Sequence, residues 1–185
     1  MSLTLKNRIM AVAALPLLVA CAEQTALSPA EIQALPKTHQ EIADTISQGF
    51  KAAEAGDNAG AAKAGTTLIA LNAQPLRGMP NLANNWTNQP AMPPMRGRVR
   101  GPGYRVNALG SGQVDQFGEI FYGVEEATIS VSGEGRYMVA VLDEDGRPPL
   151  CEAETMCRFT PDVTAQYQIV IRNEGDAGRY VFIAD

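Results

Sequence analysis

The sequence has few of the residues that most often perform catalysis or bind metals. Its 185 residues include three cysteines and a single histidine, His39. A histidine-based triad could be built only on His39, and because this residue falls at the start of a predicted helix, we interpret it as a solvated surface group. G-x-S-x-G, S-x-x-K and H-E-x-x-H motifs and glycine-rich phosphate loops are also absent. We therefore predict that the protein is not an enzyme and has neither a cofactor nor a metal.

Basic residues are fewer than acidic ones, 15 against 20, and the net charge is -5. General binding to nucleic acid relies on Lys and Arg to neutralise phosphates, so we expect no nucleic-acid partner. The abundant carboxylates leave open an alternative function, a small envelope hydrolase that uses a carboxylate pair. Asp143, Asp145 and Glu152 match three positions of a calcium loop, but Val141 stands where the first ligand should be, and we interpret the segment as an acidic hairpin turn.

The chain has no apolar run as long as the roughly 20 residues that cross a bilayer. Lys6 and Arg8 instead precede a shorter apolar run from Ile9 to Leu18. A positive start followed by a short apolar run is the pattern of a secretory signal peptide.

This run ends in Leu18-Val19-Ala20-Cys21, which resembles the lipobox of bacterial lipoproteins. The resemblance implies that residues 1–20 are a signal peptide and that Cys21 carries acyl chains such as palmitate. It also implies an anchor in the outer membrane, facing the periplasm, because Ala22 stands where an aspartate would retain the protein in the inner membrane. The alternatives are a plain signal peptide with an incidental Cys21, or an uncleaved anchor.

A short tether, 21–27, leads into a predicted helical hairpin over 28–74. Ser28 with Glu31, and Thr38 with Glu41, form capping boxes that mark helix starts. Apolar residues then recur at helical spacing in two runs, separated by a predicted stop at Gly56 and a predicted cap at Asp57. These runs contain Ile42, Ile46, Phe50 and Ala53, and then Ala61, Ala64, Leu68 and Leu71.

Residues 75–103 are rich in Pro and Gly and lose all apolar periodicity, so we predict a linker there. Trp86 in this segment either docks on its own domain or stacks against a glycan. Arg96, Arg98, Arg100 and Arg105 form a basic stripe without an intervening acid. The stripe either binds a partner or anionic lipid, or offsets carboxylates of the chain itself.

Residues 104–185 change to the alternating pattern of β-strands. Six short strands separated by turns predict an antiparallel sandwich or barrel; they cover 104–109, 117–122, 127–132, 137–142, 166–172 and 180–184. Cys151 and Cys157 have five residues between them, and in an oxidising compartment we expect them to form a disulfide. The fold class is therefore α+β, with a helical hairpin, a linker and a C-terminal β-sandwich.

Part of this domain resembles a known family. Phe159-Thr160-Pro161, Thr164-Ala165-Gln166-Tyr167, Asn173 and Gly178-Arg179-Tyr180 follow one another as in the bacterial pre-peptidase C-terminal domain and its jelly-roll relatives. The resemblance covers about Gln113 to Asp185 and implies a non-catalytic β-sandwich for secretion, substrate contact or assembly. We therefore expect a lipid-anchored binding or assembly module of the cell envelope, with an envelope protein or a glycan as partner.

Overall fold

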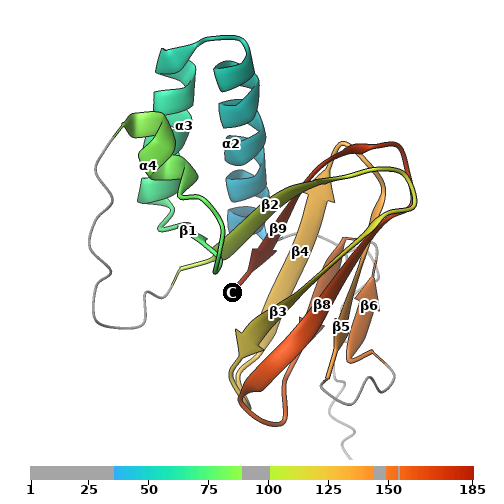
Figure 1. Ribbon diagram of the computed structural model, residues 1–185. Coiled ribbons are helices and arrows are strands. Elements are labelled where there is room, and N and C mark those ends of the chain that lie inside the picture. Colours follow the sequence, from blue (N-terminus) through green and yellow to red (C-terminus); the bar gives the residue numbers. More distant parts are fainter. Residues whose placement is uncertain (1–35, 89–100, 144–148, 154) are drawn as a thin grey trace, which may run out of the picture. The chain divides into compact units, whose positions relative to one another are not determined.

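The computed structural model describes residues 36–88, 101–143, 149–153 and 155–185, and these form three layers (Figure 1). One layer is helical, and the other two are β-sheets. Sheet A has the strand order β1-β2-β9-β4-β7, and sheet B has the order β3-β8-β5-β6. Sheet A contains β1 (Gln74–Pro75), β2 (Gly103–Leu109), β4 (Ala127–Gly133), β7 (Met156–Phe159) and β9 (Gly178–Ala184). Sheet B contains β3 (Val114–Phe121), β5 (Tyr137–Leu142), β6 (Cys151–Ala153) and β8 (Ala165–Asn173).

Sheet A is the middle layer, and its strand β9 is buried on both faces. Tyr180 and Phe182 belong to the core shared with sheet B. Val181 and Ile183, which alternate with them, belong to a second core shared with the helices. Because successive side chains of a strand point to opposite faces, β9 lies in both cores, and the helices and sheets form one compact unit, Gln33–Asp185.

The helical layer is built from α2 (Lys37–Glu54), α3 (Asn58–Ala70) and the short α4 (Leu82–Thr87). The predicted hairpin is present: Gly56 takes the positive φ of a turn, and the Asp57 side chain caps α3 by accepting a hydrogen bond from Gly60 N. The capping box predicted at Thr38 is wrong. The helix starts at Lys37 and has Pro36 as its N-cap, without a side-chain cap, because the fixed φ of proline already favours a helix entry.

The first part of the predicted linker is folded. Gln74 and Pro75 pair in parallel with the start of β2, and α4 packs on α3. Trp86 of α4 docks on the helical layer, where its ring meets that of Phe50 edge-on at 5.3 Å. These apolar contacts, and not local periodicity, hold the segment in place, which is why the sequence pattern does not reveal them.

The predicted fold class is confirmed: the protein is α+β, and antiparallel strands form a sandwich in its C-terminal part. Each of the six predicted strands is present, with β3 beginning earlier than predicted. The described residues contain three further strands, β1, β6 and β7, which are too short to show an alternating pattern in the sequence.

The disulfide between Cys151 and Cys157 is present, with a Cα–Cα distance of 5.8 Å. Cys151 lies on β6, the edge strand of sheet B, and Cys157 lies on β7, the edge strand of sheet A. The bond therefore joins the two sheets covalently along one side of the sandwich. The opposite side, formed by β1, β2 and β3, has no such bond among the described residues.

Several predicted features lie outside the described residues. They are the signal peptide, Cys21, the capping box at Ser28, the arginines Arg96, Arg98 and Arg100, and the turn at Asp145–Gly146. Within the described ranges, no helix is long and apolar enough to cross a membrane.

Reduction of the disulfide is expected to lower the stability of the protein without preventing secretion. The closed loop is short, so the chain-entropy model gives a loss of about 2 kcal/mol in the free energy of unfolding. Denaturant unfolding with and without reductant measures the loss, and free-thiol labelling of the unreduced protein tests whether the bond forms in cells. An unchanged unfolding midpoint after complete reduction would contradict the stabilising role.

Candidate functional site

His39 is buried and contacts a buried serine and an exposed aspartate. Its side chain is on the face of α2 that packs on β9 and β4, one turn before Ile42. Nδ1 is 2.9 Å from Oγ of Ser130 on β4, and Nε2 is 3.1 Å from Oδ2 of Asp185, although the latter contact lacks hydrogen-bond geometry. These are the residue types of a catalytic triad.

The histidine and the serine of this cluster are sealed from substrate. Ser130 is 3% exposed and His39 is 1% exposed, whereas a nucleophilic serine must reach the bond that it attacks. The prediction that His39 is a solvated surface group is therefore wrong, because α2 lies on sheet A and buries its own first turn. His39 precedes Ile42 and Ile46 at spacings of three and four, and this spacing is the signal in the sequence that could have revealed its burial.

On the side of the sandwich away from the disulfide, part of the gap between the sheets is closed by an ion pair. Arg105 of β2 contacts Asp115 of β3 at 3.1 Å and lies over the ring of Phe117. Tyr180 and Asn107 also donate hydrogen bonds to Asp115. Arg105 therefore serves the chain itself, in line with the interpretation that the arginine stripe offsets the chain's own carboxylates.

The electrostatics of this cluster favour the ionised carboxylate. Burial by itself would raise the pKa of Asp115, but hydrogen bonds from Tyr180, Asn107 and Arg105 outweigh it and hold the pKa below its usual value. Burial and the hydrogen bond to Asp115 raise the pKa of Tyr180. The charges of Arg105 and Asp115 are thus neutralised within the protein, which suits a structural role.

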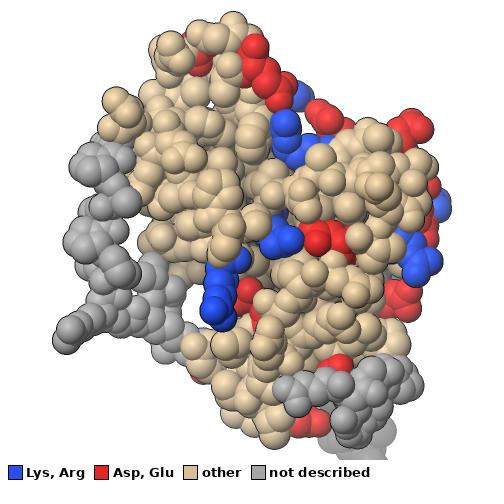
Figure 2. Space-filling model, in the orientation of Figure 1, with Lys and Arg blue, Asp and Glu red and all other residues tan. Residues whose placement is uncertain are grey.

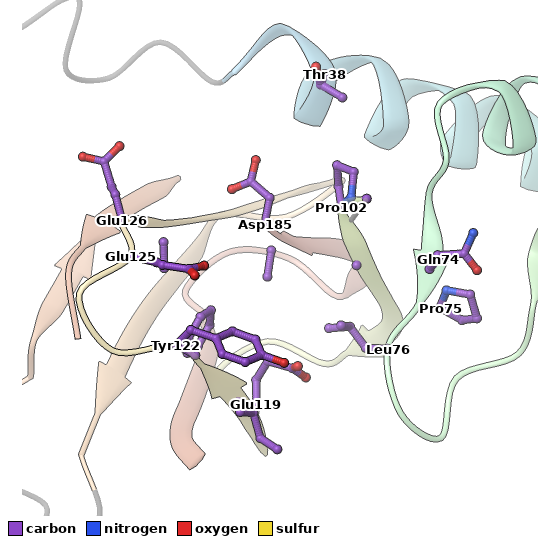
Figure 3. Close-up of a pocket in the computed structure, with 16 residues that line it drawn as sticks. Thr38, Gln74, Pro75, Leu76, Pro102, Glu119, Tyr122, Glu125, Glu126 and Asp185 are labelled. Atoms are coloured by element: carbon purple, nitrogen blue, oxygen red, sulfur yellow. The ribbon is translucent and has the colours of Figure 1, made fainter. Parts of the chain in front are cut away.

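Beyond this ion pair the gap widens into a cleft of about 890 Å³ (Figure 3). Its walls come from five separate parts of the chain: the start of α2, β1, the start of β2, the end of β3 with the following loop, and the end of β9. The acidic residues that line it are Glu119, Glu125, Glu126 and Asp185. In Figure 3 the side chains of Glu119 and Glu125 point toward the cleft, while that of Glu126 points away.

Glu119 is a cleft residue whose carboxyl group is affected by its surroundings. Burial raises its pKa, and a hydrogen bond from the Ile120 amide opposes the rise. Among the described residues, no lysine or arginine forms an ion pair with it. Among the described residues, the cleft therefore holds a half-buried carboxyl group that no cation neutralises, an arrangement that favours a cationic ligand.

Two exposed apolar side chains lie at one side of the cleft or in the loop that follows it. Ile120 is 57% exposed and lines the cleft, and Val124 in the next loop is 85% exposed. This loop is held against residues 161–164 by hydrogen bonds from Gly123 N to Thr164 Oγ1 and from Val124 N to Pro161 O. Val124 also has a φ of 58°, which is unusual for a β-branched residue. Exposed apolar side chains that lie together are a common feature of protein-binding surfaces.

The predicted site residues are not brought together. Trp86 is docked in the helical layer, Arg105 is paired with Asp115, and the disulfide lies on the other side of the sandwich. Figure 2 shows acidic and basic side chains next to one another, with few over α3 and α4. In the described parts of the chain, no group of three or more His, Cys, Asp or Glu residues could hold a metal.

No protein-family model matches the sequence, and no curated protein sequence matches it. Three solved structures are similar in fold. The periplasmic inhibitor of g-type lysozyme PliG from Aeromonas hydrophila is 6% identical, with a TM-score of 0.43, over 61% of this chain and 94% of its own. The pre-peptidase C-terminal domain of Bacillus anthracis collagenase is 14% identical, with a TM-score of 0.39, over 44% and 87%. PliG from Salmonella Typhimurium is 11% identical, with a TM-score of 0.33, over 45% and 89%.

Replacing Glu119 with Gln is expected to stabilise the fold at neutral pH. Because the pKa of Glu119 is raised in the folded state, its stabilising contribution exists only below its unfolded pKa and is lost as pH rises through the folded pKa. Gln keeps the shape without the charge. Denaturant unfolding at neutral pH should give a higher midpoint for Glu119→Gln.

The difference between wild type and Glu119→Gln should vanish in acid, where the carboxyl group is protonated in both the folded and the unfolded state. The matched control is Glu152→Gln, which replaces an exposed glutamate on β6. It should leave the unfolding midpoint unchanged. A lower midpoint for Glu119→Gln at neutral pH would show that Glu119 has a structural role instead.

Proposed function

We propose that the protein is a non-catalytic binding module of the bacterial cell envelope. It is anchored in the outer membrane by lipid on Cys21, faces the periplasm, and binds an envelope protein through the cleft on the side of the sandwich away from the disulfide. The observation that carries this proposal is a contrast: His39 and Ser130 are sealed from solvent, whereas the open cleft offers carboxylates and apolar side chains, which are groups suited to binding.

The cost of the cleft to the fold supports this proposal. A half-buried carboxyl group with a raised pKa destabilises the folded state once the pH rises above that pKa. Exposed side chains such as Ile120 and Val124 contribute little to the core. Features that cost stability and remain exposed are typical of surfaces used for binding.

The arginine stripe remains a second candidate contact surface. Arg96, Arg98 and Arg100 lie in the part of the chain that the structure does not describe, and Arg105 is engaged by Asp115. If the stripe binds an acidic partner or anionic lipid, replacement of these three residues by Ser should weaken the contact, and the remaining contact should lose its dependence on salt.

A carboxylate hydrolase is the second candidate function, and Glu119 is the observation that favours it. A general acid in such enzymes needs a pKa raised by burial and a second carboxylate across the cleft. Glu119 has the raised pKa, and Glu125 and Asp185 line the same cleft. Its substrate would be an envelope glycan.

The anchor is tested by replacing Cys21 with Ser. Without the thiol no acyl chain is attached, so the protein should leave the membrane fraction or accumulate as uncleaved precursor. Fractionation and intact-mass measurement of the wild type check this. A wild-type mass that corresponds to an unmodified Cys21 would exclude the lipid anchor.

The binding surface is tested by crosslinking in intact cells. Ile120→Ser should abolish the main crosslinked species or reduce it several-fold, because the side chain is 57% exposed at the cleft. Leu150→Ser is the matched control, since Leu150 is 45% exposed near the opposite edge of sheet B. Both variants should keep the wild-type unfolding midpoint.

Two outcomes of these experiments would contradict the proposal. Crosslinks that are the same in wild type and Ile120→Ser would remove the cleft as the binding surface. Hydrolysis of an envelope glycan by the purified protein, abolished by Glu119→Gln, would replace the binding function with the hydrolase.

A further inference from the structure

Strand β3 is an edge strand that borders the cleft. It runs for eight residues and, among the described residues, pairs only with β8. Its other edge presents backbone amides and carbonyls without a neighbouring strand, and such edges pair readily with an added strand. Lysine and proline, which often protect edge strands, are absent from β3.

The two faces of β3 differ in chemistry. Asp115, Phe117 and Glu119 point inward between the sheets and are half-buried, whereas the alternate residues are exposed. The exposed set includes Val114, which is 42% exposed, and Ile120, which is 57% exposed. A strand added beside β3 would place its own side chains alternately next to these two sets.

The inward carboxylates restrict which strand can pair. Inward-pointing charges are a device that prevents indiscriminate pairing of edges, because an incoming apolar side chain would bury them without compensation. Asp115 is already neutralised by Arg105 at 3.1 Å. Glu119 has no such cation among the described residues, and the space beside it is the cleft.

We propose that the partner binds by adding an extended segment to the free edge of β3, and that this segment alternates basic and apolar residues. The inference rests on the proposed binding function and specifies its partner. A lysine or arginine that points inward enters the cleft and pairs with Glu119. The apolar residues on either side of it lie on the outer face, next to Ile120. The backbone of the segment supplies hydrogen bonds to β3, and the cation supplies the selectivity.

The test uses synthetic peptides as long as β3 and titration calorimetry with the full-length protein. A peptide of alternating lysine and valine should bind, and one of alternating glutamate and valine should not. Glu119→Gln should weaken binding of the lysine peptide about tenfold, the effect of losing one charge-assisted hydrogen bond. Glu152→Gln, which removes an exposed carboxylate from β6, should leave the affinity unchanged.

The strand geometry is tested with two N-methylated versions of the lysine peptide, each methylated at one of the two alternating sets of amides. In an added edge strand only one set faces β3, so one version should lose binding and the other should keep it. Equal binding of both versions would overturn strand addition. Equal binding of the glutamate and lysine peptides, or an affinity unchanged by Glu119→Gln, would overturn the role of Glu119.

Failure of this inference and failure of the proposed function can be told apart. If Ile120→Ser removes the cellular crosslinks but the peptides show no dependence on charge or N-methylation, the cleft binds its partner in another way and only the inference fails. If Ile120→Ser leaves the crosslinks unchanged, the proposed function fails as well.

Discussion

The burial of β9 on both faces is the constraint on which the rest of the structure depends. Phe182 packs toward sheet B and Ile183 packs toward the helices, and both are almost fully buried. If β9 were covered on one side only, the apolar side chains on its other side would be exposed to water. The cost would be about 1.5–3 kcal/mol for each large side chain. The helical layer is therefore part of the same folding unit as the sandwich, and its position on β9 and β4 also buries His39.

Polar groups fix where these layers meet. His39 contacts Ser130 at 2.9 Å between α2 and sheet A, and Tyr104 accepts a hydrogen bond from Leu82 N at the start of α4. Arg105 and Asp115 hold the two sheets together at a third place. Apolar packing tolerates small shifts of one layer over another, whereas each of these contacts is satisfied in one position only.

Local patterns in the sequence predict most of the elements but not how the layers combine. The alternation from Ala127 to Ser132 and the helical spacing of Ile42 and Ile46 each depend on neighbouring residues, and both predictions agree with the structure. The packing of α2 on β9 joins residues well over a hundred positions apart, and no local period encodes it. The uninterrupted apolar run from Tyr180 to Ala184 is the one trace of burial on both faces.

The cleft was harder to predict than the fold. Its walls come from five separate segments of the chain. Glu119 was not among the predicted site residues, because an acidic residue on the inward face of β3 breaks the expected alternation of apolar and polar residues. An acidic residue at an inward-facing position of a strand is itself the sequence feature that could have revealed the cleft. Asp115 and Glu119 are the two acidic residues at inward positions of β3. Asp115 is neutralised by Arg105, whereas Glu119 faces the cleft.

The disulfide has a mechanical consequence for the cleft. Cys151 and Cys157 tie the two sheets together at β6 and β7, while the cleft lies on the opposite side, at β1, β2 and β3. The covalent bond is therefore remote from the cleft, and the sheets beside the cleft are held by noncovalent contacts such as the ion pair of Arg105 with Asp115. A partner that binds at the cleft meets side chains and backbone there, and the disulfide fixes the two sheets without occupying that surface.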